Sequence, residues 1–334
     1  METSRLGDSD LEMTRVAFGA WAIGGLMWGG ADERDAVEAV RAALDAGINT
    51  IDTAPVYGCG RSEELVGRAL LGRRDGVIVA TKCGLRWDRS EGPVRFDTPT
   101  PEGGRVRVHY NLRPESLREE CEQSLRRLGV DVIDLYQIHW PSPVDPLEDA
   151  LDTLVRLREE GKVRWLGVSN FTASQLEVAR GCEAVVAAQP PYSLVDRRSD
   201  AEVLPFCRAH DLGVIAYSPM GRGLLTGRVP ADRRFATSDH RSEHPSFSDE
   251  NRRRVARALE RARPMAERHG VSLANLAVAW VLATPGVNAA LVGARNVAQV
   301  TENARAAGVS LSPEEWSELA GIFPNLPPRP VGGR

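Results

Sequence analysis

A carboxylate and a phenol lie close together in the stretch INTIDTAPVYGCGR, residues 48–61. Ile48 and Ile51 belong to a short apolar run that is typical of a buried strand. Asp52 ends this run, and Tyr57 follows in a segment that contains proline and glycine. Aspartate often caps a turn and tyrosine often packs on a surface, so the pair alone decides nothing. If both side chains face a reactive site, other polar residues must converge on the same place.

Polar residues also end most of the other short apolar runs of the chain. These are Lys82, His139, Ser169, Asn170, Gln189 and Tyr217. Each could have an ordinary structural role alone, such as a solvated lysine, a hydrogen-bonded histidine or a capping serine. Together they indicate one site, because a buried lysine needs a carboxylate partner and Asp52 is the nearest candidate. A lysine cation beside Tyr57 would lower the pKa of the phenol from about 10 and allow proton exchange with a substrate oxygen.

Short apolar runs alternate with segments of helical period along the chain. The predicted strands are Val16–Gly19, Ile48–Asp52, Val77–Thr81, Val132–His139, Val163–Val168, Ala184–Gln189, Val214–Tyr217 and Ala289–Val292. Leu117, Cys121, Leu125 and Leu128 share one helical face, and Gly129 follows as a stop signal. Strands that alternate with helices predict a parallel sheet with crossover helices.

A closed (β/α)8 TIM barrel fits the length of 334 residues. The alternative, an open doubly wound sheet, would need a G-x-G-x-x-G turn after the first strand, and FGAWAIGGLMWGG lacks that spacing. We therefore expect a single α/β barrel domain over residues 1–334. Its core should cover about residues 15–324, between a polar N-terminal tail and a Pro/Gly-rich C-terminal tail. Residues 84–112 and 228–249 are excursions that follow strands, and they should form long loops at the C-terminal face of the barrel.

Composition and charge exclude several classes of partner. The formal net charge of −4 gives no reason to expect nucleic acid or an anionic membrane. No apolar run approaches the ~20 residues that span a bilayer, and the N-terminus METSRLGDSDLEMTR is unlike a signal peptide. The five cysteines form no C-x-x-C pair, which favours a reducing compartment and a cytoplasmic protein. The sequence shows no apolar patch that would indicate an oligomeric state.

Six segments together resemble the aldo-keto reductase family, in the order and at the spacing typical of that family. They are TIDTAPVYG, TKCG, DLYQIHW, GKVRWLGVSNF, AYSPMGRGLLTG and GARNVAQVTEN. The resemblance covers Arg15 to about Pro324 and is strongest for a bacterial branch with AIGG and MWGG near the start. It implies a (β/α)8 barrel, a nicotinamide cofactor bound without a Rossmann turn, and reduction of a small-molecule carbonyl substrate.

The resemblance also assigns roles to individual residues. The catalytic tetrad of the family falls on Asp52, Tyr57, Lys82 and His139 without substitution. In that scheme Tyr57 gives a proton to the developing alkoxide, and His139 orients the carbonyl. Lys82 tunes Tyr57 and is held by Asp52. The residues implied to bind the cofactor are Gly19, Ala20, Trp21, Asp52, Ser169, Asn170, Gln189, Tyr217, Ser218, Pro219, Met220, Gly221, Gly223, Leu224, Gly293, Arg295, Gln299, Glu302 and Asn303.

Within this set, the resemblance implies which part of the cofactor each group of residues meets. Ser169, Asn170 and Gln189 would hold the nicotinamide carboxamide, and Tyr217 would stack on the ring. Residues 218–224 resemble the strap over the pyrophosphate, and the segment that follows the last strand resembles the adenosine end of the site.

At the adenosine end, Arg295 and Gln299 would meet the 2′-phosphate, and Glu302 with Asn303 would meet the adenine. Many family members carry a lysine where this chain has Gly293. Arg295 can replace that charge, since a guanidinium suits a phosphate. The resemblance therefore predicts NADPH and NADP⁺ as cofactors, with NADH as the alternative.

The excursion at residues 84–112 is longer than the resemblance predicts. It lies where the family builds the wall of its substrate pocket, so the substrate class does not follow from the resemblance. The candidate wall residues are Trp21, Trp28, Trp87 and Trp140. Aromatic walls suit apolar or sugar-like carbonyl compounds.

The resulting hypothesis is an NADPH-dependent oxidoreductase that reduces an aldehyde or ketone to the alcohol. An NAD(P)⁺-dependent sugar or polyol dehydrogenase stays open, because the same chemistry runs in both directions. A non-catalytic NADPH-binding sensor subunit is a second alternative. A metal-dependent barrel hydrolase is a third, but only His139 ends a strand, and His240 and His244 lack an H-E-x-x-H pattern. We therefore expect no metal.

Overall fold

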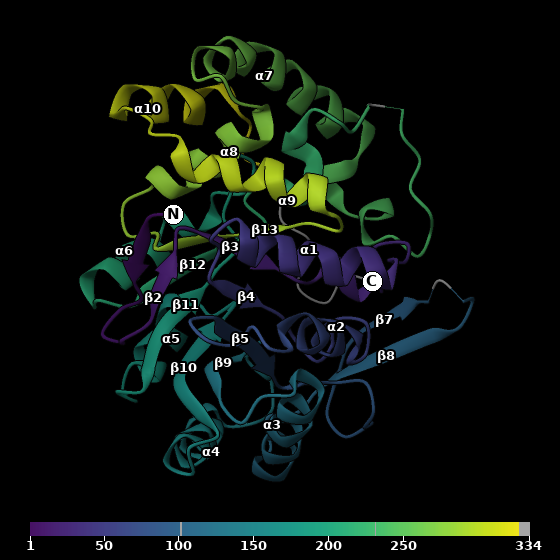
Figure 1. Cartoon of the computed structure of the whole chain (residues 1–334), viewed down its shortest axis with the longest axis vertical. Helices are drawn as coiled ribbons and strands as arrows, with labels where there is room; N and C mark the ends of the chain where they lie inside the picture. Colours follow the sequence, from purple (N-terminus) through teal and green to yellow (C-terminus); the bar gives the residue numbers. More distant parts are fainter. Residues whose placement is uncertain (101, 231, 327–334) are drawn as a thin grey trace.

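Parallel strands form the centre of the molecule (Figure 1). The computed structural model describes residues 1–100, 102–230 and 232–326. Within them, the strands close into a barrel in the order β10, β11, β12, β13, β3, β4, β5 and β9. These strands are β3 (Val16–Gly19), β4 (Thr50–Asp52), β5 (Ile78–Cys83), β9 (Ile133–Ile138), β10 (Val163–Ser169), β11 (Val185–Gln189), β12 (Gly213–Tyr217) and β13 (Ala289–Gly293). Each overlaps a predicted run, and the predicted (β/α)8 barrel is confirmed.

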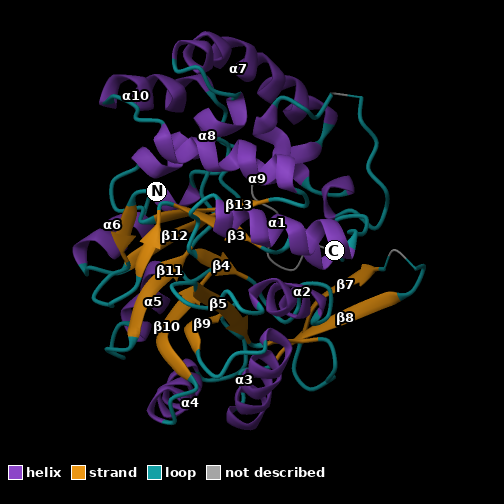
Figure 2. Ribbon diagram, viewed as in Figure 1, coloured by secondary structure: helices purple, strands orange, loops and turns teal. Residues whose placement is uncertain are grey.

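Helices surround the barrel, and most of them cover the outer faces of its strands (Figure 2). They are α1 (Glu33–Asp45), α2 (Arg61–Leu70), α3 (Pro114–Leu128), α4 (Leu147–Glu159), α5 (Ala173–Ala179), α6 (Val203–Ala209), α7 (Asp249–Arg268), α8 (Leu273–Ala283), α9 (Val297–Ala304) and α10 (Pro313–Ile322). α3 ends as its sequence predicts, because Gly129 has a left-handed φ of 63° and its amide closes the last turn. α7 and α10 pack on α8 as a second layer at one side of the barrel (Figure 1).

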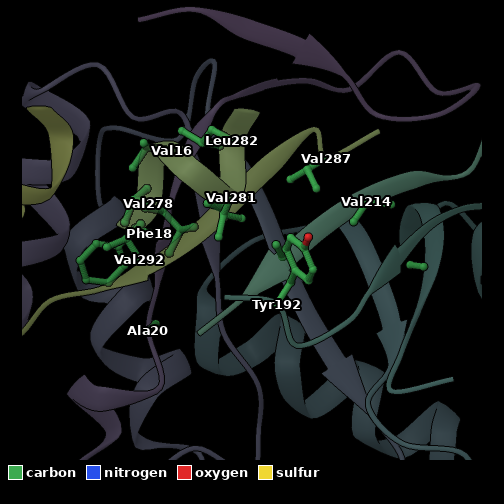
Figure 3. Close-up of a cluster of buried hydrophobic side chains, with 14 of the residues drawn as sticks. Val16, Phe18, Ala20, Tyr192, Val214, Val278, Val281, Leu282, Val287 and Val292 are labelled. Carbon is green, nitrogen blue, oxygen red and sulfur yellow. The ribbon is translucent and has the colours of Figure 1, made fainter. Parts of the chain in front are cut away.

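The hydrophobic core lies on both sides of the barrel wall. Outside the barrel, Phe18 and Val292 of neighbouring strands share a buried cluster with Val278 and Val281 of α8 (Figure 3). Inside the barrel, a second cluster includes residues such as Leu135. Strands that are buried on both faces read as nearly continuous apolar runs, which is why the sequence pattern indicated them.

The N-terminal segment closes one end of the barrel. β1 (Thr3–Arg5) and β2 (Glu12–Thr14) pair in antiparallel fashion, and Leu6 and Leu11 are buried in the cluster that fills the barrel interior. Gly7 has a φ of 52°, and a Cβ there would collide with a backbone carbonyl of β11. The expected polar tail is therefore corrected to a hairpin. Its strands are so short, and its apolar residues so separated by polar ones, that no period is visible in the sequence.

The first excursion also has regular structure. β6 (Leu85–Arg86), β7 (Val94–Pro99) and β8 (Arg105–Tyr110) form an antiparallel sheet in the order β6, β8, β7. β7 and β8 project away from the barrel as a ribbon (Figure 1). The expected long loop over residues 84–112 is therefore corrected. Salt bridges from Arg105 and Arg107 to Asp97 hold the ribbon, so a charged composition does not mean a loop here.

The second excursion, residues 228–249, is largely irregular, as predicted. Its described residues form two short 3-10 turns, η4 (His240–Ser242) and η5 (Pro245–Phe247). The predicted Pro/Gly-rich C-terminal tail falls mostly on residues 327–334, which lie outside the described residues.

Candidate active site

A buried ion pair lies at the carboxyl ends of two neighbouring strands, β4 and β5. Nζ of Lys82 is 2.5 Å from Oδ1 of Asp52 and 2.8 Å from the carbonyl oxygen of Thr53. The side-chain amides of Gln137 and Gln189 donate to Oδ2 of Asp52, at 3.1 and 2.9 Å. Both carboxylate oxygens therefore accept hydrogen bonds, which fixes the position of the ammonium group.

Tyr57 and His139 present a phenol and an imidazole to the same cavity. Their ring centroids are 5.6 Å apart, at an interplanar angle of 82°. Nζ of Lys82 lies 5.1 Å from the centre of the Tyr57 ring. Among the described residues, none hydrogen-bonds the Tyr57 hydroxyl or either ring nitrogen of His139. Both polar groups can therefore bind a ligand in the cavity.

Burial sets the protonation states of these groups. It raises the pKa of the Tyr57 phenol well above its usual value, and the charge of Asp52 adds to the rise. Burial lowers the pKa of the Lys82 amine, while Asp52 opposes this change. The pKa of His139 falls well below its usual value because of burial and the nearby charges of Lys82 and Arg95. Tyr57 is therefore protonated and His139 is neutral near pH 7.

The expected lowering of the Tyr57 pKa by Lys82 is thus corrected. Lost solvation of the phenolate outweighs the attraction of a cation that lies 5.1 Å from the ring centre. The result suits a proton donor, since the phenol keeps its proton until negative charge develops beside it.

Close backbone packing holds Tyr57 in place. The amide of Tyr57 donates to the carbonyl of Ala54 in the turn after β4. A Cβ at Gly24 would lie 2.8 Å from the carbonyl carbon of Tyr57, and a Cβ at Gly58 would collide with the carbonyl oxygen of Gly24. Gly58 also has a φ of 67°. The loop after β3 therefore packs directly on the backbone of Tyr57, which requires glycine at both positions.

A cavity of about 1610 Å³ opens at this end of the barrel. Its lining includes both His139, which follows β9, and Asn303 of α9. The cavity is larger than a typical pocket for a drug-sized ligand. Gly19 and Gly293 are paired in register and both line the cavity, so this part of its floor carries no side chain. The size of the cavity and the absence of side chains at these two positions fit a dinucleotide together with a small substrate.

A row of hydrogen-bonded side chains borders the ion pair. Ser169 Oγ donates to the carbonyl of Gln189 at 2.8 Å, and Asn170 Nδ2 donates to the carbonyl of His139 and to Ser169 Oγ, both at 3.0 Å. The Tyr217 hydroxyl donates to Asn170 Oδ1 at 2.8 Å, and burial raises its pKa to about 12. No described residue donates to Gln189 Oε1. This oxygen can accept from a carboxamide NH₂, which fits a nicotinamide.

The far half of the cavity carries a strap-like loop and an unpaired arginine. Ser218, Arg222 and Gly223 have φ values of 58°, 57° and 92°, and all line the cavity. The backbone amide of Arg295 donates to Gln299 Oε1 at 2.8 Å. Within the described residues, the guanidinium of Arg295 forms no ion pair or hydrogen bond. Its charge can therefore meet a phosphate at the rim.

Comparison with known families decides the class of the protein. The model of the Aldo/keto reductase family matches residues 15–323. The chain belongs to the aldo-keto reductase family. This aldo-keto reductase is therefore an oxidoreductase that interconverts carbonyl and alcohol groups with a nicotinamide cofactor.

Individual relatives agree with this assignment. The aldo-keto reductase is 38% identical to aldo-keto reductase YhdN of Bacillus subtilis (strain 168), over 99% of this chain and 96% of that protein. It is 36% identical to an NADH-specific methylglyoxal reductase of Escherichia coli (strain K12), over 93% of this chain and 95% of that protein. The structure of glycerol dehydrogenase AKR11B4 from Gluconobacter oxydans matches with a TM-score of 0.85 at 41% identity, over 96% of this chain and 94% of that chain.

Most residues predicted to bind the cofactor line the cavity of the aldo-keto reductase. They are Gly19, Trp21, Asp52, Ser169, Asn170, Gln189, Tyr217, Ser218, Pro219, Met220, Gly223, Gly293, Arg295, Gln299, Glu302 and Asn303. Ala20, Gly221 and Leu224 do not line it, and Leu224 belongs to the hydrophobic core. Lys82 does not line it either, because its ammonium group is buried against Asp52.

The predicted aromatic wall is partly present. Trp21, Trp28 and Trp140 line the cavity, but Trp87 does not. The Trp87 ring packs against the cluster beneath the β6–β8 sheet, and the guanidinium of Arg127 lies 5.7 Å from its centre. The assignment of Trp87 to the pocket is therefore corrected, because this segment folds into a sheet instead of a loop over the cavity.

Residues from the excursions line the cavity without having been predicted. The guanidinium of Arg95 in β7 lies 4.2 Å from the centre of the Trp140 ring. The His240 ring lies 4.7 Å from the rings of both Trp21 and Trp28. Neither residue ends a strand, so the strand-end pattern could not identify them. The only sequence signal for these two residues was that they lie in long excursions that follow strands, and such excursions are expected at the C-terminal face of the barrel.

The described residues contain no group of three or more His, Cys, Asp and Glu side chains that could hold a metal ion. Nδ1 of His240 lies 2.9 Å from the carbonyl oxygen of Met27, and Nδ1 of His244 accepts from the amide of Ser246 at 3.2 Å. Nδ1 of each histidine therefore has a backbone partner, which for His240 lies in the loop after β3 and for His244 in its own loop. None of the described helices is long and apolar enough to cross a membrane.

Proposed function

We propose that this aldo-keto reductase reduces aldehydes or ketones with NADPH, using Asp52, Tyr57, Lys82 and His139 as its catalytic tetrad. One observation carries the proposal. A protonated phenol and a neutral imidazole face one cavity without a hydrogen-bond partner among the described residues. A buried ammonium–carboxylate pair lies behind the phenol. A carbonyl oxygen held between the phenol and the imidazole would accept a hydrogen bond from each.

Each tetrad residue has a distinct part in the reaction. Bound NADPH supplies the hydride that adds to the carbonyl carbon. His139 donates a hydrogen bond to the carbonyl oxygen and orients it while negative charge develops there. Tyr57 transfers its phenolic proton to the same oxygen, so that the product leaves as an alcohol. Lys82 stabilises the charge that Tyr57 then acquires, and Asp52 holds Lys82 in place. The lysine thus acts on the developing phenolate and not on the resting phenol.

We also propose that the enzyme prefers NADPH to NADH. The support is the guanidinium of Arg295, which has no ion pair among the described residues and lies at the end of the cavity with Gln299. A guanidinium can bind a phosphate with two parallel hydrogen bonds. The relative from Escherichia coli is named as NADH-specific, so family membership alone does not decide the cofactor.

The first test follows the nicotinamide absorbance with purified protein, NADPH and 4-nitrobenzaldehyde. We expect multiple turnovers with the wild type, and a kcat that is lower by about 10²- to 10⁴-fold in Tyr57→Phe. Tyr136→Phe is the matched control, because it also removes a buried tyrosine hydroxyl and Tyr136 does not line the cavity. Equal turnover in Tyr57→Phe and wild type would remove Tyr57 as the acid. Tight NADPH binding without any turnover would instead support a sensor.

Alcohol oxidation is the second candidate for the direction of the reaction. It is favoured by the likeness to a glycerol dehydrogenase, at 41% identity over nearly the whole chain. Rates of NADP⁺ reduction with polyols, compared with NADPH oxidation by the matching aldehydes at the same pH, would separate the two directions.

We further propose that the protein is cytoplasmic. Its five cysteines are all free thiols, which suits a reducing compartment. Measuring the protein in fractions of its native cells would test this location.

A further inference from the structure

His240 and Trp28 form a pair of aromatic rings in the wall of the cavity. Their ring centroids are 4.7 Å apart at 68°, and both residues line the cavity. His240 comes from the second excursion, and Trp28 comes from the loop after β3. The backbones of the two loops meet here, because Asp239 forms a β-bridge with Trp28 and the amide of His240 donates to the carbonyl of Met27.

The hydrogen bonds of His240 define which of its nitrogens is an acceptor. Nδ1 lies 2.9 Å from the carbonyl oxygen of Met27, which can only accept a hydrogen bond. Nδ1 must therefore carry the proton. Burial lowers the pKa of His240 to about 3, so the ring is neutral and Nε2 is a bare acceptor. Nε2 is buried and has no hydrogen-bond partner among the described residues.

Trp28 supplies the complementary group. Its Nε1–H is a donor, and it too is buried without a partner among the described residues. An unpaired donor and an unpaired acceptor thus lie in adjacent rings of the same wall. Folded proteins rarely leave buried polar groups unpaired, so the two nitrogens together point to a ligand. A hydroxyl group can satisfy both, because it accepts one hydrogen bond and donates another.

We propose that His240 and Trp28 form a subsite for a substrate hydroxyl, which selects hydroxylated carbonyl compounds and the corresponding polyols. The inference rests on the proposed reductase function and names its substrate class. The position of the subsite sets the length of the substrate. The Trp21 ring contacts both the subsite and the proposed acid, with its centroid 4.7 Å from that of His240 and 6.1 Å from that of Tyr57, whereas no ring contact joins His240 to Tyr57 among the described residues. The hydroxyl must therefore lie several bonds from the carbonyl.

Binding requires a small opening of the wall. Both nitrogens are covered in this structure, so a hydroxyl reaches them when the turn η4 that carries His240 moves outward. This turn belongs to the largely irregular second excursion, and residues 237–243 all line the cavity. Its attachment to the loop after β3 consists of the contacts of Asp239 and His240 described above and of the Arg241 guanidinium, which lies 4.9 Å from the centre of the Trp28 ring.

The test compares two aldehydes of similar shape, 4-(hydroxymethyl)benzaldehyde and 4-ethylbenzaldehyde. We expect the wild type to favour the hydroxylated compound in kcat/KM. His240→Phe and Trp28→Phe keep an aromatic ring but remove the acceptor or the donor. Each should lower the ratio of the two kcat/KM values by about 10-fold, through the hydroxylated substrate only. His210→Phe and Trp87→Phe make the same changes outside the cavity and should leave the ratio unchanged.

The outcomes distinguish a hydroxyl subsite from rings that only pack. Equal losses of kcat/KM with both aldehydes would show that the rings only hold the wall. Unchanged kcat/KM values with both aldehydes would show that neither nitrogen binds the substrate hydroxyl. Either result overturns the subsite. Calorimetric binding of the two product alcohols tests the subsite without turnover. If the wild type reduces no aldehyde but binds the hydroxylated alcohol through His240, the proposed reductase function fails and the subsite stands.

Discussion

The protonation states of Tyr57 and His139 predict how reduction depends on pH. Reduction needs the phenol protonated, and burial raises its pKa well above the usual value of 10.0. The imidazole is already neutral, because its pKa lies well below 6.5. The enzyme loses activity only when the phenol is deprotonated, which happens as the pH rises through the raised pKa. We therefore expect kcat/KM for 4-nitrobenzaldehyde to stay flat from about pH 7 to pH 9. A tenfold fall per pH unit within this window would contradict Tyr57 as the donor.

The proposed contact of Arg295 with the cofactor predicts how a single substitution changes the preference for NADPH over NADH. Arg295→Gln removes the charge proposed to meet the 2′-phosphate, and a hydrogen bond to a charged group contributes ~1.5–3 kcal/mol. The KM for NADPH should therefore rise by about 10- to 100-fold, while the KM for NADH changes little. Arg263→Gln is the matched control, since Arg263 is absent from the cavity wall and its guanidinium pairs with Glu260 on the surface of α7. Equal changes with both cofactors would place Arg295 elsewhere than at the 2′-phosphate.

The contact between α3 and β5 predicts a pH dependence of stability. Glu120 of α3 is buried, and its Oε2 accepts from the amide of Gly84, the residue after β5, at 2.7 Å, while Oε1 has no partner among the described residues. Burial raises its pKa from 4.5 to about 8, although Arg86 opposes this. When folding raises the pKa of a carboxyl group, the protonated carboxyl stabilises the folded state. This contribution to the free energy of unfolding is fully present below the pKa that the group has in the unfolded chain. That stability is lost as the pH rises through about 8.

Glu120→Gln removes this titration while keeping an oxygen that can accept from Gly84. Between about pH 5 and pH 9, the Tm of the wild type should therefore fall relative to that of the variant. Glu115→Gln changes an exposed glutamate in the first turn of the same helix and should show no such trend. Parallel Tm curves for wild type and Glu120→Gln would mean that Glu120 is not protonated in the fold.

The elements differ in how much of them the sequence could reveal. The barrel strands were predicted because both of their faces are buried, and the polar residue that ends each strand was predicted with them. Asp52, Tyr57, Lys82 and His139 lie together because strand ends must meet at one face. The β6–β8 sheet was missed, since its charged residues pair with each other on an exposed ribbon. His240 and Arg95 were missed because loop and ribbon contacts join segments far apart in sequence, and no local period records them.

At the scale of the whole molecule, the barrel separates stability from chemistry. The N-terminal hairpin closes one end, with Leu11 only 1% exposed in the cluster that fills the interior. The proposed tetrad and the cavity lie at the carboxyl ends of the strands. The shape of the cavity at the carboxyl ends of the strands depends on the barrel wall and not on the side chains of the N-terminal hairpin. In barrels of this kind, the face away from the strand carboxyl ends contributes stability and not catalysis.

Leu11→Ala tests this separation. Removing a fully buried leucine side chain leaves a cavity and should lower the free energy of unfolding by ~2–5 kcal/mol, measured by urea denaturation. The kcat of the folded enzyme with 4-nitrobenzaldehyde should stay within about twofold of the wild type, because Leu11 packs in the interior cluster and reaches the mouth only through the barrel wall. Leu71→Ala is the control for stability, since Leu71 is 74% exposed. A large loss of kcat in Leu11→Ala at unchanged folded fraction would show that packing at the closed end positions the residues at the mouth, and the two ends of the barrel would then act as one unit.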